Sequence, residues 1–574
     1  MLHRACRRTT LFVFLLLLIS STSFGQDKVA KIDELVKSFS QLGQFNGSIL
    51  VAENGRVIYK KGFGYANMEW KIPNDVETKF RLGSLTKQFT STLILQLVEQ
   101  GKIKLDGKIT DYLPDYRKDT GDRVTIHQLL NHTSGIPSYT DQPGFLQEVS
   151  RNPFTVTDFV KKYTSGNLEF EPGSKFSYNN SGYFLLGAII EKLTGKTYAD
   201  VLRDNIFVPL GMKNSGYDSS SALLPKRASG YAKTPAGYVN AAYLDMSIPY
   251  AAGSLYSTVE DLYIWDQALY GDKLLTSKSK ELMFTPGLQD YGYGIGIRDS
   301  ELGDKTKLKT IEHSGGINGF STFMMHFVAD KHMVVVLDNT GQFRTLRPMI
   351  MSVANILYGK PYDTAKLQVG ELVFKLANEK DVQTAIKQYR DLKASGSKDY
   401  DFSQGQLPSA AFQLLRSNRA KDAIELFKLN IEMFPEAAKP YEHLAEGYVA
   451  VGEKELAIKN YKRSLELDPK NTSAADALKR VETAGTNVVT KGFDSLIGRY
   501  EVAPDFILTI TTENGKIYGQ ATGQQRFELE AISDTKFAIR VVGAEVEFNR
   551  DDKGAVTGLV LHQGGRDIPA KRLP

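Results

Sequence analysis

Strand-like segments stand at both ends of the N-terminal region of this chain, with helical patterns between them. Residues 46–65 alternate as in a hairpin, and Glu53-Asn54-Gly55 supplies the turn. Near residue 310 the strand pattern returns, with short strands predicted over Thr310–His313, Phe320–His326 and Met333–Leu337. Strands at both ends predict one α/β unit whose ends meet in a single antiparallel sheet flanked by helices, at about residues 30–360.

A different pattern occupies residues 365–485, where helix formers dominate. Ala423-Ile424, Phe427 and Pro435 are matched 34 positions later by Ala457-Ile458, Tyr461 and Pro469. This period and pattern are typical of tetratricopeptide helix pairs, and Ala385-Ile386 with Tyr389 resembles a degenerate copy. We therefore predict a helical segment that could bind a protein partner. Two clear copies are few for a stable array, so a role as the functional core of the protein is the weaker hypothesis.

From about residue 490 to 574 the sequence predicts short strands separated by glycine turns. They indicate a small β sandwich or barrel without a catalytic constellation. Examples of these segments are Phe506–Ile510, Lys516–Gly519, Phe537–Val542, Val546–Phe548 and Leu559–His562. The expected fold class is thus multidomain: an α/β domain, a helical segment and an all-β domain.

The N-terminus has the form of a secretory signal. Arginines precede the apolar run Leu11–Ile19, and small residues at Ser23 and Gly25 predict cleavage after Gly25. We therefore expect an exported protein, periplasmic or secreted, with no stable membrane span after cleavage of residues 1–25. The only cysteine, Cys6, lies before the apolar run, which disfavours a lipid anchor and excludes disulfides and thiol catalysis in a mature chain.

Charge and motifs exclude several other functions. The formal net charge is +5, and three of the basic residues are arginines in the predicted signal, so a mature chain is nearly neutral and unsuited to nucleic acid. The histidines form no HExxH motif, and the chain has no G-x-S-x-G elbow. The sequence therefore predicts no metal site and requires no cofactor.

Ser84 and Lys87 stand three residues apart at the start of a predicted helix whose apolar positions are Phe89, Leu93, Leu97 and Val98. Residues at this spacing share a helix face. A serine hydroxyl needs a base to become a good nucleophile, and a desolvated lysine can serve because burial lowers its pKa. The spacing alone is weak, because Ser277/Lys280 and other pairs repeat it.

Two further motifs follow in order. They are Tyr178-Asn179-Asn180 and His313-Ser314-Gly315-Gly316. Together with Ser84-Leu85-Thr86-Lys87 they resemble the serine β-lactamase and penicillin-binding protein superfamily, closest to its class C branch with D-aminopeptidase, D-Ala-D-Ala carboxypeptidase and esterase relatives. Other stretches of residues 30–360 resemble that branch too: Phe80-Arg81-Leu82-Gly83, Leu129–Ile136, Pro172–Tyr178, Pro209–Met212, Tyr291–Gly294 and Gly315–Phe320.

The resemblance implies a role for each matching residue. Ser84 is the acylated nucleophile, Lys87 assists its deprotonation, and Tyr178 carries a proton towards the leaving group; which of the last two is the principal base stays open. Asn180 is expected to hydrogen-bond Lys87 or the substrate amide. The backbone N–H groups of Ser84 and Gly316 are expected to form the oxyanion hole, next to Gly315. The alternative is structural: a packed aromatic at Tyr178, a turn at Asn180 and a strand histidine at His313.

His313 departs from the Lys-Thr-Gly motif of many relatives. An unperturbed histidine is mostly neutral at pH 7, whereas a lysine there provides a fixed cation for a carboxylate. We therefore expect weak β-lactamase activity and a small-molecule or peptide substrate with an ester or peptide-like amide. The alternatives are a D-Ala-D-Ala carboxypeptidase, a class C-type β-lactamase, or a penicillin-recognising sensor with slow or no turnover.

Overall fold

The computed structural model divides into two compact units, Met1–Leu367 and Gln368–Pro574. The predicted signal peptide lies outside the described residues. These run from 27 to 573, apart from residues 143–144, 146–148, 235–236, 484–492, 504–505, 514–515, 524–525, 532, 534, 540–543, 552–553 and 564–565.

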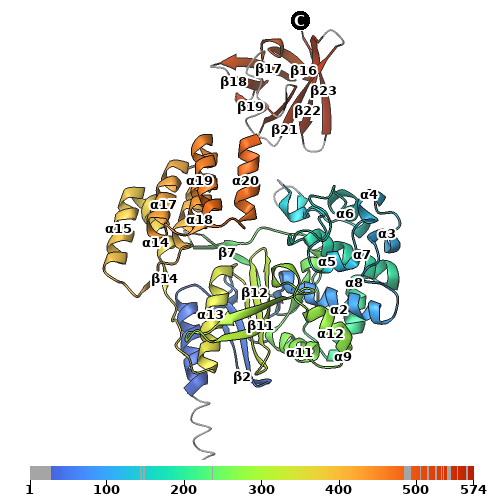
Figure 1. The fold of residues 1–574 in the computed structure, drawn as a ribbon, viewed down its shortest axis with the longest axis vertical. Coiled ribbons are helices and arrows are strands. Elements are labelled where there is room, and N and C mark those ends of the chain that lie inside the picture. The colour runs from blue at the N-terminus through green and yellow to red at the C-terminus, as the bar shows by residue number, and fades with distance from the viewer. Residues whose placement is uncertain are drawn as a thin grey trace, which may run out of the picture. The chain divides into compact units, whose positions relative to one another are not determined.

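The first unit is built on a six-stranded antiparallel sheet (Figure 1), which confirms that the two ends of the α/β domain meet. β1 pairs with β13, so that Gly47 lies opposite Asp338. The strand order is β10 (Gly296–Glu301), β11 (Lys307–Ile317), β12 (Phe320–Phe327), β13 (His332–Asp338), β1 (Gly47–Glu53) and β2 (Arg56–Phe63).

The turn between β1 and β2 fixes the register of the N-terminal hairpin. Asn54 and Gly55 have φ of 51° and 71°, the left-handed conformation that a type I′ turn requires at both central positions. The predicted turn residues are therefore those that the hairpin uses.

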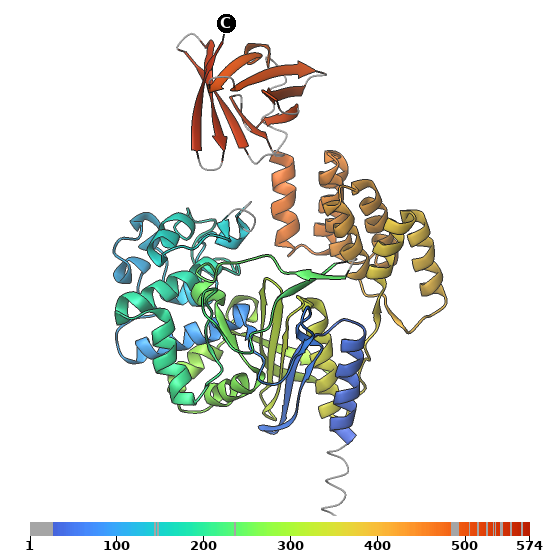
Figure 2. The ribbon, with the colours of Figure 1, turned by 180° about the vertical axis from the view of Figure 1, so that it is seen from behind.

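Alternate residues of β1 pack into two different cores. Ile49 and Val51 face a core shared with α13 (Phe343–Leu357) and the helix over residues 27–41, which Figure 2 shows beside α13. Leu50 and Ala52 face the larger core beneath the helices of the opposite layer. This period of two is what a strand buried on both faces produces, and it sandwiches the sheet between two helical layers.

The opposite layer carries the long helices that hold the candidate site. They are α2 (Thr86–Glu99), α7 (Asn180–Thr194) and α11 (Val259–Tyr270), with the shorter α5 (Ile126–Leu130), α6 (Val156–Tyr163), α8 (Tyr198–Leu202), α10 (Tyr250–Gly253) and α12 (Ser277–Phe284). The helix predicted after Ser84 is α2. It ends at Glu99, and Gly101 follows with φ of 67°.

The second unit begins with helices, as predicted for residues 365–485. They are α14 (Val369–Glu379), α15 (Val382–Ala394), α16 (Gln406–Arg416), α17 (Ala420–Met433), α18 (Ala438–Ala450), α19 (Lys454–Leu467) and α20 (Thr472–Thr483). The matched residues Ala423, Phe427, Ala457 and Tyr461 are all buried. The helical segment is confirmed, while its assignment to the tetratricopeptide type stays a prediction.

The C-terminal β domain is a closed eight-stranded barrel, which decides between the two predicted forms. Its strands are β16 (Gly498–Ala503), β17 (Phe506–Glu513), β18 (Lys516–Ala521), β19 (Phe527–Ala531), β20 (Lys536–Ile539), β21 (Ala544–Arg550), β22 (Val556–Gln563) and β23 (Arg566–Arg572). Among the described helices, none is both long and apolar enough to span a bilayer.

Candidate active site

The chain leading into α2 sets the position of Ser84. β5 (Phe80–Arg81) runs into a short 3-10 turn, Gly83–Leu85, where Gly83 has φ of 55°. A Cβ on Gly83 would stand 2.9 Å from both the backbone nitrogen and the backbone oxygen of Gly316. Only glycine allows this conformation and this approach, which brings β11 against the first turn of α2.

Lys87 lies one turn further, fully buried, with its side-chain nitrogen at the centre of the site. The nitrogen lies 3.0 Å from Ser84 Oγ, 2.8 Å from Asn180 Oδ1 and 2.9 Å from the carbonyl oxygen of Ala252. Among the described residues no carboxylate forms an ion pair with it. Burial therefore holds the pKa of Lys87 well below the ordinary value of a lysine.

This geometry suits a neutral amine. The oxygens of Asn180 and Ala252 can only accept, so they take the two N–H groups of an uncharged lysine. The lone pair is then left facing the hydroxyl of Ser84. In this form Ser84 O–H donates to Lys87 Nζ, which is the arrangement that general-base activation of a serine requires.

Tyr178 and Asn180 reach the site from the start of α7. Asn179 caps that helix, because its Oδ1 accepts from the backbone nitrogen of Gly182 at 2.8 Å. Asn180 is the first helical residue, and its Nδ2 donates to Thr140 Oγ1 at 3.1 Å. The helix cap thus orients the amide whose oxygen meets Lys87.

The ring of Tyr178 lies beside Lys87. As a whole the residue is 37% exposed, and its ring centre lies 4.8 Å from Lys87 Nζ. Burial raises the pKa of Tyr178 above its ordinary value, and the influence of Ser84 opposes this only in part. Tyr178 is therefore a neutral phenol at pH 7, able to donate a proton.

A cavity of about 130 Å³ opens in front of Ser84. Ser84, Asn180 and Gly316 line it, together with Tyr139, Ile248 and Asn318. A Cβ on Gly316 would meet no atom within 4 Å, so its backbone borders open space. Gly315 is required for close packing, because a Cβ there would fall 1.9 Å from the carbonyl oxygen of Leu82. Gly315 lets β11 pack against the chain that leads to Ser84.

His313 is buried near Tyr178 and Tyr291, and it is neutral. Its Nδ1 lies 2.6 Å from the carbonyl oxygen of Ser314, which can only accept, so Nδ1 carries the proton and Nε2 accepts from the Tyr291 hydroxyl at 2.8 Å. Burial lowers the pKa of His313 to about 3. The side chain therefore supplies no cation to a substrate at neutral pH.

Some residues of the site had no role predicted from sequence. The Ala252 carbonyl carries no side-chain signal at all. His132 lies in the stretch Leu129–Ile136, which resembles the family but to which the sequence assigned no function. Its side chain is buried, its φ is 61°, and its ring centre lies 4.3 Å from that of Tyr178. Its Nδ1 accepts from the backbone nitrogen of Asn179 at 3.1 Å. His132 thus braces both Tyr178 and the start of α7.

The described residues contain no group of three or more His, Cys, Asp or Glu side chains arranged to hold a metal ion.

Comparison with known proteins agrees with this geometry. The beta-lactamase family matches residues 32–355, and a domain family of unknown function, DUF3471, matches residues 485–572. Penicillin-binding protein 4* of Bacillus subtilis is 33% identical over 364 residues, which cover 59% of this chain and 78% of that relative. Protein flp of Staphylococcus aureus is 29% identical over 329 residues, covering 54% of this chain and 63% of the relative, less than two thirds of its length.

The crystal structure of FmtA from Staphylococcus aureus is similar with a TM-score of 0.50 and 27% identity, covering 59% of this chain and 91% of FmtA. More than half of the chain thus matches one family, and the match contains the whole six-stranded sheet and every residue of the candidate site. The chain belongs to the beta-lactamase family.

Proposed function

We propose that the protein is a serine hydrolase that acts through an acyl-enzyme on Ser84, with an ester or a peptide-like amide as substrate. The observation that carries this proposal is the fully buried Lys87, whose Nζ lies 3.0 Å from Ser84 Oγ. Burial without a carboxylate partner among the described residues lowers the pKa of Lys87 and favours its uncharged, basic form, and the nearest proton that it can take is that of Ser84.

Acylation would proceed in balanced proton transfers. Ser84 Oγ attacks the carbonyl carbon while its proton passes to Lys87 Nζ, and the carbonyl oxygen becomes an oxyanion facing the N–H groups of Ser84 and Gly316. The carbon–leaving-group bond then breaks as Tyr178 gives its proton to the departing oxygen or nitrogen. The proton on Lys87 replaces the one that Tyr178 gave away, and water attacks the acyl-enzyme by the same route.

The pKa values favour Lys87 over Tyr178 as the principal base. Burial lowers the pKa of Lys87 and raises that of Tyr178, so the amine is poised to accept a proton and the phenol to donate one. Neutral His313 supports the preference for esters and amides over β-lactams, because it offers no fixed charge to a carboxylate beside the reacting carbonyl.

A panel of chromogenic esters, D-amino-acid amides, D-Ala-D-Ala peptides and nitrocefin tests this function. Wild type should hydrolyse members of the first two classes, and Ser84→Ala should lose every activity. Activity that survives in Ser84→Ala would overturn the assignment of the nucleophile. Nitrocefin turnover as fast as that of dedicated β-lactamases would overturn the substrate preference.

A second candidate is a penicillin-recognising protein that acylates and turns over slowly or not at all. It is favoured by the 33% identity to a protein named penicillin-binding protein 4*. A burst of product without steady turnover, with a covalent penicilloyl adduct on Ser84 in mass spectrometry, would select this candidate. Complete release of hydrolysed product would select the hydrolase.

We also propose that the chain is exported, as the pattern of residues 1–25 predicts. N-terminal sequencing of the protein made in a bacterial host should then begin at Gln26. A protein that begins at Met1 would argue against export.

A further inference from the structure

A second and larger pocket, of about 640 Å³, lies next to the cavity of Ser84. The two share Leu244 and Asn318 as lining residues. Asn318 Nδ2 donates to the carbonyl oxygen of Ala242 at 2.9 Å, which ties the β11–β12 turn to the loop of the larger pocket. A substrate held at Ser84 that extends past Asn318 and Leu244 therefore enters the larger pocket.

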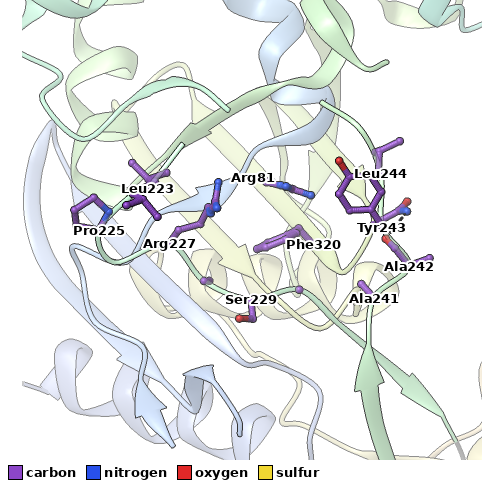
Figure 3. Close-up of a pocket in the computed structure, with 14 residues that line it drawn as sticks. Arg81, Leu223, Pro225, Arg227, Ser229, Ala241, Ala242, Tyr243, Leu244 and Phe320 are labelled. Carbon is purple, nitrogen blue, oxygen red and sulfur yellow. Dashed lines mark hydrogen bonds between the residues drawn. The ribbon is translucent and has the colours of Figure 1, made fainter. Parts of the chain in front are cut away.

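Two arginines line this larger pocket, and they share one buried carboxylate. Arg81 Nε donates to Asp218 Oδ2 at 2.7 Å, and Arg227 Nη1 donates to Asp218 Oδ1 at 2.8 Å. Asp218 is 1% exposed, whereas Arg81 and Arg227 are 16% and 26% exposed. The three side chains together carry one net positive charge, and Figure 3 shows both arginines at the pocket.

The guanidinium group of Arg81 has N–H donors that no described residue uses. Its Nε is used by Asp218, but neither of its two terminal nitrogens has a partner within the described part of the chain. Arg227, in contrast, also donates to the carbonyl oxygens of Ser219 and Ala222. No Asp or Glu is among the described residues that line this pocket. A partly buried guanidinium fork with free N–H groups is a site built for an oxyanion.

Apolar side chains form part of the wall, and Ser229 and Asn318 add polar groups to it. Phe320, Leu244 and Tyr243 face the same space (Figure 3), and Gly230 is packed so closely that a Cβ there would meet Phe320 at 2.7 Å. The pocket therefore offers apolar surface close to two arginines. Such a wall suits an arm of carbon atoms with a terminal negative charge.

We infer that the pocket at Arg81 and Arg227 is a specificity subsite for a carboxylate on the substrate, remote from the bond that Ser84 cleaves. This inference rests on the proposed function, and it names the class of substrate: an ester or amide with an anionic arm. Arg81 and Ser84 are three residues apart, so their Cα atoms lie at most about 11 Å from each other. Arg81 and Ser84 line different pockets, so an arm of several bonds is what would place a carboxylate at Arg81 while Ser84 holds the carbonyl.

Paired substrates that differ only in charge test the subsite in the full-length protein. In the first pair, p-nitrophenyl hydrogen suberate and p-nitrophenyl methyl suberate carry the group on the acyl side. In the second pair, octanoyl thioesters of mercaptohexanoate and its methyl ester carry it on the leaving side. We expect a kcat/KM for the anionic member about tenfold to a hundredfold above that for the neutral member in at least one pair, the contribution of a charge-assisted hydrogen bond.

Arg81→Gln should reduce that ratio to about one, because the free guanidinium donors are lost. Arg81→Lys, which keeps the charge but not the fork, should retain part of it. Arg123→Gln removes an exposed arginine paired with Glu171 and serves as the matched control, with an unchanged ratio. An equal loss of both members of a pair in Arg81→Gln means a structural role only, and it overturns the inference.

A second measurement needs no variant. The wild-type preference for the anionic member should shrink as salt rises from about 20 mM to about 500 mM, because ions screen the attraction. If wild type hydrolyses neutral esters in a Ser84-dependent way but shows no charge preference in either pair, the subsite is refuted and the proposed function stands. If Ser84→Ala retains full activity, the proposed function itself fails.

Discussion

The side-chain nitrogen of Lys87 lies 2.8 Å from Oδ1 of Asn180, although the two residues are 93 positions apart and come from different helices. Asn180 gives Lys87 a polar partner without giving it a negative charge. This distinction decides the protonation of the lysine, because an acceptor of equal size that carried a charge would stabilise the ammonium. The amide oxygen of Asn180 therefore accepts a hydrogen bond from the buried amine of Lys87 without raising its pKa as a charged partner would.

Asn180→Asp should consequently lower the activity, because it adds a negative charge beside Lys87 while hardly changing the size of the side chain. A carboxylate 2.8 Å from the amine raises the pKa of Lys87, so at pH 7 the lysine is protonated and cannot accept the serine proton. We expect kcat/KM for a chromogenic ester at pH 7 to fall at least tenfold, with recovery at alkaline pH. A pH profile of kcat/KM measures the shift. Asn152→Asp, at an exposed position, should leave the profile unchanged.

Lys87→Met should change how stability depends on pH. The pKa of Lys87 is lowered in the folded protein, so between that lowered value and about 10.5 the unfolded chain binds one more proton than the folded chain. Stability contributed by this group is therefore lost as pH falls and gained as pH rises towards 10.5. The free energy of unfolding of wild type should climb by up to about 1.4 kcal/mol per pH unit relative to Lys87→Met in this window. Parallel curves for the two proteins would show that Lys87 is charged in the folded state.

Tyr178→Phe should affect substrates according to their leaving groups. The variant keeps the ring beside His132 and loses only the phenol hydroxyl. A p-nitrophenolate leaves without protonation, whereas an amide nitrogen must receive a proton as the bond breaks. We expect a loss of about a hundredfold or more with amides, the usual contribution of a general acid, and a much smaller loss with p-nitrophenyl esters. Equal losses with both classes would contradict the assignment of Tyr178 as proton donor.

His313 should make the protein sensitive to acid. The pKa of His313 is about 3 in the folded protein and about 6.5 in the unfolded chain. Between these two pH values the histidine is therefore protonated in the unfolded chain and neutral in the folded protein. The stability from this group is present above pH 6.5 and is lost as pH falls through this window. Between pH 7 and pH 4 wild type should lose about 3 kcal/mol more than His313→Asn. Urea unfolding of both proteins across this range measures the difference, and equal losses would refute the assignment.

Sequence patterns were informative where structure is decided locally. The turn at Asn54-Gly55 and the helix after Ser84 depend on neighbouring residues, and both were predicted. β10 was missed because Gly296–Glu301 carries charged residues on an edge strand and lacks an apolar pattern. β19, Phe527–Ala531, lies inside the closed barrel and also lacks a clear strand pattern, because acidic residues occupy alternate positions. Such strands form because partners exist in space, which a local pattern does not record.

The same limit applies to the candidate site. Motifs indicated Ser84, Lys87, Tyr178 and Asn180, whose side chains the structure brings together. No motif could indicate the carbonyl of Ala252, because every residue has one. The lowered pKa of Lys87 also depends on complete burial with no carboxylate partner, and this follows only from the packing of α2, α7 and α10.

Gly83→Ala should damage catalysis through the backbone. Gly83 has φ of 55°, and an added Cβ would stand 2.9 Å from the backbone nitrogen of Gly316, one of the proposed oxyanion-hole donors. The shift that relieves this contact moves the donor away from the developing charge. We expect kcat to fall about a hundredfold to a thousandfold, the typical cost of losing one donor.

Gly101→Ala is the matched control, because Gly101 also has a positive φ of 67° but an added Cβ there meets no atom within 4 Å. It should lose about 1 kcal/mol of stability and keep its kcat, since the backbone strain is similar but the site is untouched. If both variants lost activity equally, the effect would belong to backbone strain and not to the oxyanion hole.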